Sequence, residues 1–147
     1  MSTVERFEDL IVWQEAREIV KVVYRLTRKF PRKELYGLAD QIQKAAVSTM
    51  SNIAEGFESG TNKQFINFLY TSKGSNGEVR SQAYVALDLG YISQVECDDL
   101  VRRCDILSRR IYNFIEYLKN TPFEGPKFRE SGPVWYINEP ETRNPET

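Results

Sequence analysis

The stretch that decides the fold is Ser48-Thr49-Met50-Ser51-Asn52-Ile53-Ala54-Glu55-Gly56. It places small and polar residues along what is otherwise an apolar helix seam. We expect the helix to end at Gly56, because glycine is common just past a helix C-terminus. A second small-residue segment, 72–78, follows some twenty residues later. A helix with so little bulk at its core positions must approach a neighbour closely or hold polar groups for a purpose.

Apolar residues recur every three or four positions in four segments, which is the period of amphipathic helices. We predict helices over 12–30, ended by Pro31; over 35–56; from Thr61 or Asn62 to near Gly90; and from Ser93 or Asp98 to near Asn120. No segment shows sustained strand-type alternation, and the short loops favour antiparallel neighbours. The sequence therefore predicts an all-α fold, an antiparallel up-down-up-down four-helix bundle over residues 1–120.

The third predicted helix contains two interior glycines, Gly74 and Gly77. Each destabilises a helix by about 1 kcal/mol relative to alanine. We therefore expect a kink there, or a close backbone contact with the small face of the second helix.

Residues 121–147 differ in composition from the rest, since five of the six prolines lie there. Such a Pro-rich C-terminal segment is usually an extended or disordered tail. One part does not fit that pattern, because Val134-Trp135-Tyr136-Ile137 is apolar and aromatic. Docking of this part on a surface of the bundle, its own or a neighbour's, is the other interpretation.

The chain has 147 residues, a net charge of −1, 41% hydrophobic residues and 28% charged residues, as in ordinary soluble domains. No apolar stretch approaches the roughly 18 residues of a membrane-spanning helix. The N-terminus shows no basic region followed by an apolar one, as a signal peptide would. We expect a cytoplasmic protein without a membrane partner.

The absence of histidine excludes several kinds of site. Histidine triads, histidine zinc sites and the Glu-x-x-His di-iron motif all need that side chain. Cys97 and Cys104 would lie roughly 10 Å apart on one helix, beyond the reach of a disulfide. We interpret Cys104 as a core residue and Cys97 as incidental. The sequence predicts no catalytic residue, metal or cofactor.

The first predicted helix carries a concentration of positive charge. Between positions 17 and 33 there are seven basic residues and one acidic residue, Glu18, so the local charge is +6 on a chain of −1. The basic residues are Arg17, Lys21, Arg25 and Arg28, spaced to share one face, and then Lys29, Arg32 and Lys33. A basic stripe is typical of phosphate binding. The alternative is a solvated face balanced by acidic residues of a neighbouring helix.

Two further groups of residues are candidates besides this basic face. Arg102, Arg103, Arg109 and Arg110 form a second basic cluster on the fourth helix, partly at the edge of the core. The polar residues Asn52, Glu55 and Glu78 are candidates for acid–base chemistry if the carboxylates meet across the bundle. We favour a structural role for these three, in which they fix helix register by hydrogen bonds.

Several motifs occur in an order typical of one bacterial family: Phe7-Glu8-Asp9-Leu10-Ile11-Val12-Trp13-Gln14, Phe30-Pro31, Tyr36-Gly37-Leu38, Gln41-Ile42, Ser48 to Gly56, Gly74-Ser75 with Glu78, and Leu89-Gly90-Tyr91-Ile92. Over residues 7–119 the chain resembles the four-helix proteins encoded in intervening sequences of 23S ribosomal RNA genes. The most specific piece is 52–56. The resemblance implies a four-helix protomer and a ring-shaped homopentamer, but no enzymatic activity.

The chain is also distantly similar to the accessory variability protein of diversity-generating retroelements. That resemblance implies a pentameric barrel that binds nucleic acid and partners a reverse transcriptase.

These observations together predict a non-enzymatic homo-oligomer that binds nucleic acid, RNA rather than DNA, through the basic face. The alternative is a protein-interaction scaffold, or an accessory subunit of a partner enzyme such as a reverse transcriptase. A carboxylate-dependent enzyme using Glu55 and Glu78 is the third hypothesis.

Overall fold

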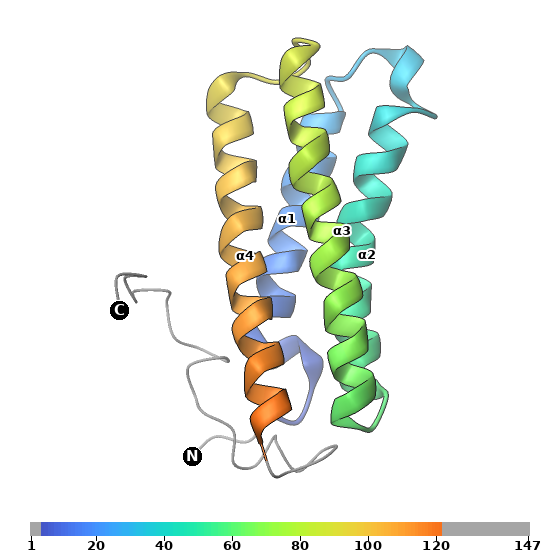
Figure 1. Ribbon diagram of the computed structural model, residues 1–147. Coiled ribbons are helices and arrows are strands. Elements are labelled where there is room, and N and C mark those ends of the chain that lie inside the picture. The colour runs from blue at the N-terminus through green and yellow to red at the C-terminus, as the bar shows by residue number, and fades with distance from the viewer. Residues whose placement is uncertain (1–3, 122–147) are drawn as a thin grey trace, which may run out of the picture.

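The computed structural model describes residues 4–121, which form an all-helical fold without strands. The helices are α1 (Ile11–Thr27), α2 (Leu38–Glu58), α3 (Asn62–Asp88) and α4 (Gln94–Asn120), with short 3-10 turns η1 (Phe7–Asp9) and η2 (Arg32–Glu34). Successive helices run in opposite directions side by side, so the predicted four-helix architecture is confirmed (Figure 1). The predictions for the tail after Thr121, including Val134 to Ile137, lie outside the described residues.

Two helix starts are fixed by the caps that the sequence predicts. Thr61 precedes α3, and its hydroxyl accepts a hydrogen bond from the Gln64 backbone N–H at 3.2 Å. Ser93 precedes α4 and forms a reciprocal capping box with Glu96, with N···O distances of 2.9 and 3.1 Å. Each cap satisfies backbone donors that would otherwise lack a partner at the helix end.

The connection between the first two helices is longer than predicted. α1 ends at Thr27, three residues before Phe30, and α2 begins at Leu38 rather than Leu35. The backbone N–H groups of Lys29 and Phe30 turn back to the carbonyls of Leu26 and Thr27, which closes the last turn of α1. Phe30 therefore packs on the core from a turn, although its spacing matches the helical series.

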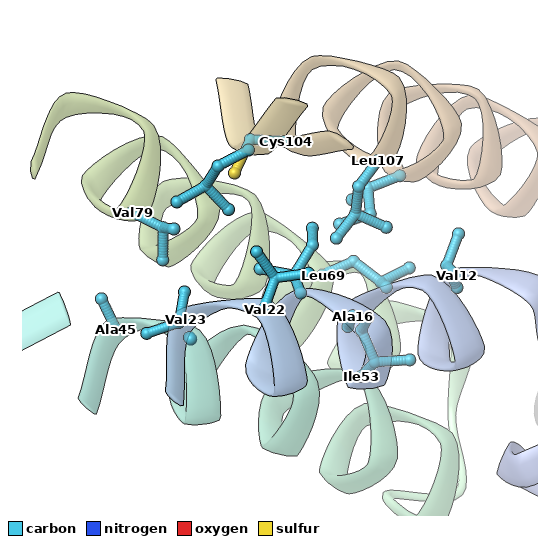
Figure 2. Close-up of a cluster of buried hydrophobic side chains, with 14 of the residues drawn as sticks. Val12, Ala16, Val22, Val23, Ala45, Ile53, Leu69, Val79, Cys104 and Leu107 are labelled. Carbon is cyan, nitrogen blue, oxygen red and sulfur yellow. The ribbon is translucent and has the colours of Figure 1, made fainter. Parts of the chain in front are cut away.

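The core lies between all four helices, and its labelled aliphatic side chains point toward one another in Figure 2. Cys104 is completely buried there, as predicted. Cys97 is also completely buried, with its Sγ 3.7 Å from the Ala83 carbonyl oxygen, so its interpretation as incidental is wrong. Both thiols are free, and each fills a core position of α4.

The role predicted for Gly56 is wrong. α2 continues through it to Glu58, and Gly56 is buried inside the helix. A Cβ atom at this position would lie 2.7 Å from Cδ1 of Phe65 and 2.8 Å from Cβ of Phe68. Glycine is therefore present because α2 and α3 approach each other too closely here for any side chain.

The prediction for Gly74 and Gly77 is wrong in its close-contact form. α3 is one uninterrupted helix through both residues, and both are exposed. A Cβ atom at either position would meet nothing within 4 Å. The close approach between α2 and α3 is made instead at Gly56 of α2 and at Ser72 of α3, which is completely buried.

Hydrogen bonds between small polar side chains fix the register of α2 against α3. The Ser72 hydroxyl donates to the Thr49 carbonyl at 2.7 Å, in a buried position. One turn away, the hydroxyls of Ser48 and Ser75 lie 2.9 Å apart. The buried Asn76 amide donates to the Cys104 carbonyl of α4 at 2.7 Å, which ties a third helix to this seam. Because unpaired buried polar groups are costly, a shift of register would be opposed at each of these contacts.

Alanine substitutions at the closely packed Gly56 and at the open Gly74 should change stability in opposite directions. Gly56→Ala should lower the free energy of unfolding by about 1–2 kcal/mol, since Phe68 Cβ is fixed to the α3 backbone and the helices must separate. Gly74→Ala should raise it by about 0.5–1 kcal/mol, because alanine is the better helix former and the site is open. Urea unfolding followed by circular dichroism measures both. Destabilisation by both substitutions to the same degree would contradict this assignment.

Candidate nucleic-acid interface

All seven basic residues of the predicted surface are exposed. Four of them, Arg17, Lys21, Arg25 and Arg28, lie along α1 and at its C-terminal cap. Lys29, Arg32 and Lys33 lie in the α1–α2 connector, which we define as residues 28–37 and which begins with Arg28. The surface therefore extends along α1 and continues onto the end of the bundle where this connector lies (Figure 1).

Three of the seven have partners within the bundle. Lys21 forms an ion pair with Glu18 at 2.9 Å on the same helix. Lys29 forms an ion pair with Glu96 of α4. The Arg17 guanidinium lies 5.6 Å from the centre of the Trp13 ring, in a cation–π arrangement. The alternative interpretation, in which an acidic residue of a neighbouring helix balances the basic charge, therefore holds for Lys29.

The remaining four form no ion pair within the described residues, although Glu34 lies near enough to Lys33 to attract it. Within residues 4–121, no carboxylate forms an ion pair with the side chains that we call the open basic cluster: Arg25, Arg28, Arg32 and Lys33. Open cations on a chain of net charge −1 leave a local positive potential at one end of the bundle.

Each arginine of the second basic cluster, on α4, is paired with a carboxylate. Asp99 accepts from Arg102 and Arg103 at 3.0 and 2.9 Å, and Asp105 accepts from Arg109 at 2.6 Å. Arg110, whose side chain is only 13% exposed, pairs with Glu15 of α1 at 2.8 Å. Arg110 therefore links α4 to α1, whereas the other three arginines pair within α4, and each of the four already has a carboxylate partner.

The α1–α2 connector is held to the rest of the bundle by Glu34. One carboxylate oxygen accepts from the Tyr91 hydroxyl at 2.8 Å, and the other accepts from the Leu38 backbone N–H at 3.3 Å, at the start of α2. A Cβ atom at Gly37 would lie 2.8 Å from that second oxygen, so glycine leaves room for this contact. The Phe30 and Tyr91 rings also pack, with centres 5.2 Å apart.

These hydrogen bonds change the acid–base properties of the Glu34 and Tyr91 pair. The Tyr91 hydrogen bond, followed by that from the Leu38 backbone, lowers the pKa of Glu34. The same contact with Glu34 raises the pKa of Tyr91. At neutral pH the pair is therefore a carboxylate that accepts from a neutral phenol.

The connector exposes two large side chains that sequence reasoning missed as surface residues. Leu35 is 55% exposed and Tyr36 is 90% exposed. The series of apolar spacings placed Leu35 on the inner face of the second helix, but α2 begins only at Leu38. The signal that could have found them is Gly37, because glycine is a favoured N-cap and a helix that begins after it leaves Leu35 and Tyr36 outside.

The structure does not bring Glu55 and Glu78 together. Gln82 donates to both Glu78 and Gln41 at 3.2 Å, so Glu78 lies beside the N-terminal half of α2. In the antiparallel register, Glu55 is then about 15 Å farther along the bundle. Glu55 is exposed and makes no hydrogen bond or ion pair within residues 4–121. The Asn52 amide donates within α2, to the Ser48 carbonyl at 2.8 Å and hydroxyl at 3.0 Å.

The thiols offer little nucleophilic character. Burial raises the pKa of Cys104 to about 12 and also raises the pKa of Cys97. No group of three metal-binding side chains comes together in the part of the chain that the structure describes. None of its helices combines the length and apolar character needed to cross a membrane.

Fold and surface define a small helical bundle protein with a basic end. The chain belongs to the 23S rRNA-intervening sequence protein family, whose model matches residues 8–113. The resemblance inferred from the motifs is thereby confirmed. No curated protein matches the sequence.

A solved structure supports the same fold. It is a protein of unknown function from the S23 ribosomal protein family of Bacteroides thetaiotaomicron VPI-5482, with a TM-score of 0.65 and 17% sequence identity. The match covers 72% of this chain and 99% of that protein.

The attachment of the connector predicts a specific change in titration. In Tyr91→Phe, the pKa of Glu34 should rise toward its ordinary value of 4.5, because the largest cause of its lowering is removed. A lowered pKa in the folded state stabilises the protein above the ordinary value, and that contribution is lost as pH falls through the lowered pKa. The destabilisation by Tyr91→Phe should therefore be present at neutral pH and vanish in acid.

A carbon-detected NMR titration of the glutamate carboxyl groups measures this change. Glu96 is an internal control, because its pKa is lowered by the Lys29 contact and should not move. An unchanged Glu34 pKa in the variant would show that Tyr91 does not hold the connector.

Proposed function

We propose that the protein is a non-enzymatic homo-oligomer that binds RNA through the open basic cluster, Arg25, Arg28, Arg32 and Lys33. The observation that carries this proposal is that these four cations form no ion pair within residues 4–121. A phosphate backbone supplies regularly spaced negative charge, and its binding to Lys and Arg is driven largely by release of condensed counterions. Three of the four are arginines, whose planar guanidinium groups match phosphate oxygens in pairs.

The pairing of the other basic residues supports this choice of surface. The α4 arginines would have to break ion pairs with Asp99, Asp105 or Glu15 before they could reach a phosphate. The open basic cluster has no such competition. Its members also lie at one end of the bundle, on α1 and the connector that follows it (Figure 1). One RNA segment could therefore contact them together.

The surroundings of the candidate reactive groups support a role without catalysis. The sequence has no histidine to act as a base near neutral pH. Its cysteines are buried thiols of raised pKa, and the two carboxylates considered for acid–base work lie on separate parts of the surface. The family to which the chain belongs is not a known enzyme family.

Exposed apolar side chains near the α3–α4 turn support self-association. Val85, Leu89 and Val95 are 43%, 53% and 78% exposed. Burial of these side chains against another copy is favourable, and a ring of five, as the family resemblance implies, would repeat the open basic cluster five times. Light scattering of the purified protein measures the number of copies. A monomer would favour the alternative, in which these side chains dock a different protein as a scaffold would.

Removal of the three arginines of the open basic cluster should weaken RNA binding and its salt dependence together. The variant Arg25→Ala/Arg28→Ala/Arg32→Ala should lose at least about tenfold in affinity near 50 mM salt. The slope of log affinity against log salt should fall by about 0.7–0.9 for each phosphate that the protein no longer neutralises. Fluorescence anisotropy with a labelled RNA across a range of salt measures both quantities, and repetition with DNA tests the preference for RNA.

The matched control removes the same net charge elsewhere. Arg102→Ala/Arg109→Ala/Lys44→Ala also eliminates three cations, each of which is paired with an aspartate in the bundle. Its affinity should stay within about threefold of the wild type. Equal losses in both variants would mean that net charge alone governs binding, and no loss in the first variant would refute the proposed surface.

A further inference from the structure

Tyr36 is the most exposed of the large apolar and aromatic side chains in residues 4–121, at 90%. A single exposed tyrosine is common on a protein surface. This one has Leu35, 55% exposed, beside it and follows Arg32 and Lys33 of the open basic cluster. An aromatic ring, an aliphatic side chain and two cations are therefore presented together by five consecutive residues.

The segment that carries Tyr36 is held in place by hydrogen bonds. The backbone N–H groups of Glu34, Leu35 and Gly37 donate to carbonyls three residues earlier, at 2.9, 3.1 and 3.0 Å. The Glu34 carboxylate is bound by Tyr91 on one side and by the Leu38 N–H on the other. Because the backbone is already ordered, binding of a ligand at Tyr36 needs little further loss of conformational entropy.

The charge around Tyr36 selects the ligand. Glu34 is the one acidic residue of the connector, and its carboxylate is turned inward to Tyr91 and Leu38. Glu34 lies near enough to Lys33 to attract it but forms no ion pair with it. The exposed side chains of residues 32–36 are therefore a ring, an aliphatic group and two cations. The complementary ligand has a flat π-face joined to negative charge, which is the chemistry of a nucleotide.

We propose that the α1–α2 connector binds an unpaired nucleotide, with its base stacked on Tyr36 and its phosphates on Arg32 and Lys33. This inference rests on the proposed function and narrows its ligand to RNA that contains single-stranded segments, such as loops or ends. In a duplex each base is already stacked and paired, so its face cannot reach a protruding ring. Base–aromatic stacking tolerates any sequence, since every base has a π-face.

The test compares three RNA ligands of equal strand length: an unstructured single strand, the same strand without its bases, and a perfect duplex. Tyr36→Ala should weaken binding of the intact single strand about 5- to 100-fold. It should leave the abasic strand and the duplex within about twofold, together with the salt slope. Tyr36→Phe should retain wild-type affinity, and Tyr112→Ala, which removes a 53% exposed tyrosine from α4, is the matched control.

The outcomes separate this inference from the proposed function. If the wild type binds none of the three ligands, the proposed function fails and this inference with it. If all three bind but Tyr36→Ala affects them equally or not at all, RNA binding stands and the stacking site is refuted. A smaller oligomer in Tyr36→Ala, measured by light scattering, would assign the ring to a contact between copies and would also refute it.

Discussion

The rest of the structure depends on the close approach of α2 and α3. Gly56 is the point of closest contact, where even a methyl group would lie 2.7 Å from the Phe65 ring. Ser72 and Thr49 then continue the seam with a buried hydroxyl-to-carbonyl hydrogen bond of 2.7 Å. A purely apolar seam could slide by one turn, whereas this one would break hydrogen bonds and collide with Phe68. Packing and polar contacts together therefore select one register, and that register sets where both bundle ends lie.

The four helices could be predicted because their apolar period is strong and their caps are local. Ser93 and Glu96 are three residues apart, so the capping box is visible without any tertiary information. Gly56 could not be assigned, since a glycine that ends a helix and one that admits a neighbour look alike in a sequence. What distinguishes them is the position of Phe65 and Phe68 on another helix. Gly74 and Gly77 could not be assigned for the same reason. The sequence suggested a close neighbour for them, but nothing in the described part of the protomer fills the space beside them.

The basic surface could be predicted as a stripe, but not the pairing of its members. Seven cations in seventeen positions are evident from the sequence, and so is the face that Arg17, Lys21, Arg25 and Arg28 share. Whether each meets an acid depends on side-chain positions across the bundle, as with Lys29 and Glu96. The connector was missed for a related reason. Leu35 continues the spacing of the α2 core positions, yet the Glu34 contacts start the helix three residues later and leave Leu35 and Tyr36 outside.

The cations of the open basic cluster are unpaired partly because acidic residues of α4 are paired with other groups. Glu96 is engaged by the Ser93 cap and by Lys29, and Asp99 accepts from two arginines of its own helix. Both carboxylates are therefore engaged by residues other than Arg25, Arg28 and Arg32. Glu34, the acid nearest in sequence, is held by Tyr91. The same contacts that order the helix ends therefore leave the cations unpaired, which gives a rigid bundle a positive end without a positive net charge.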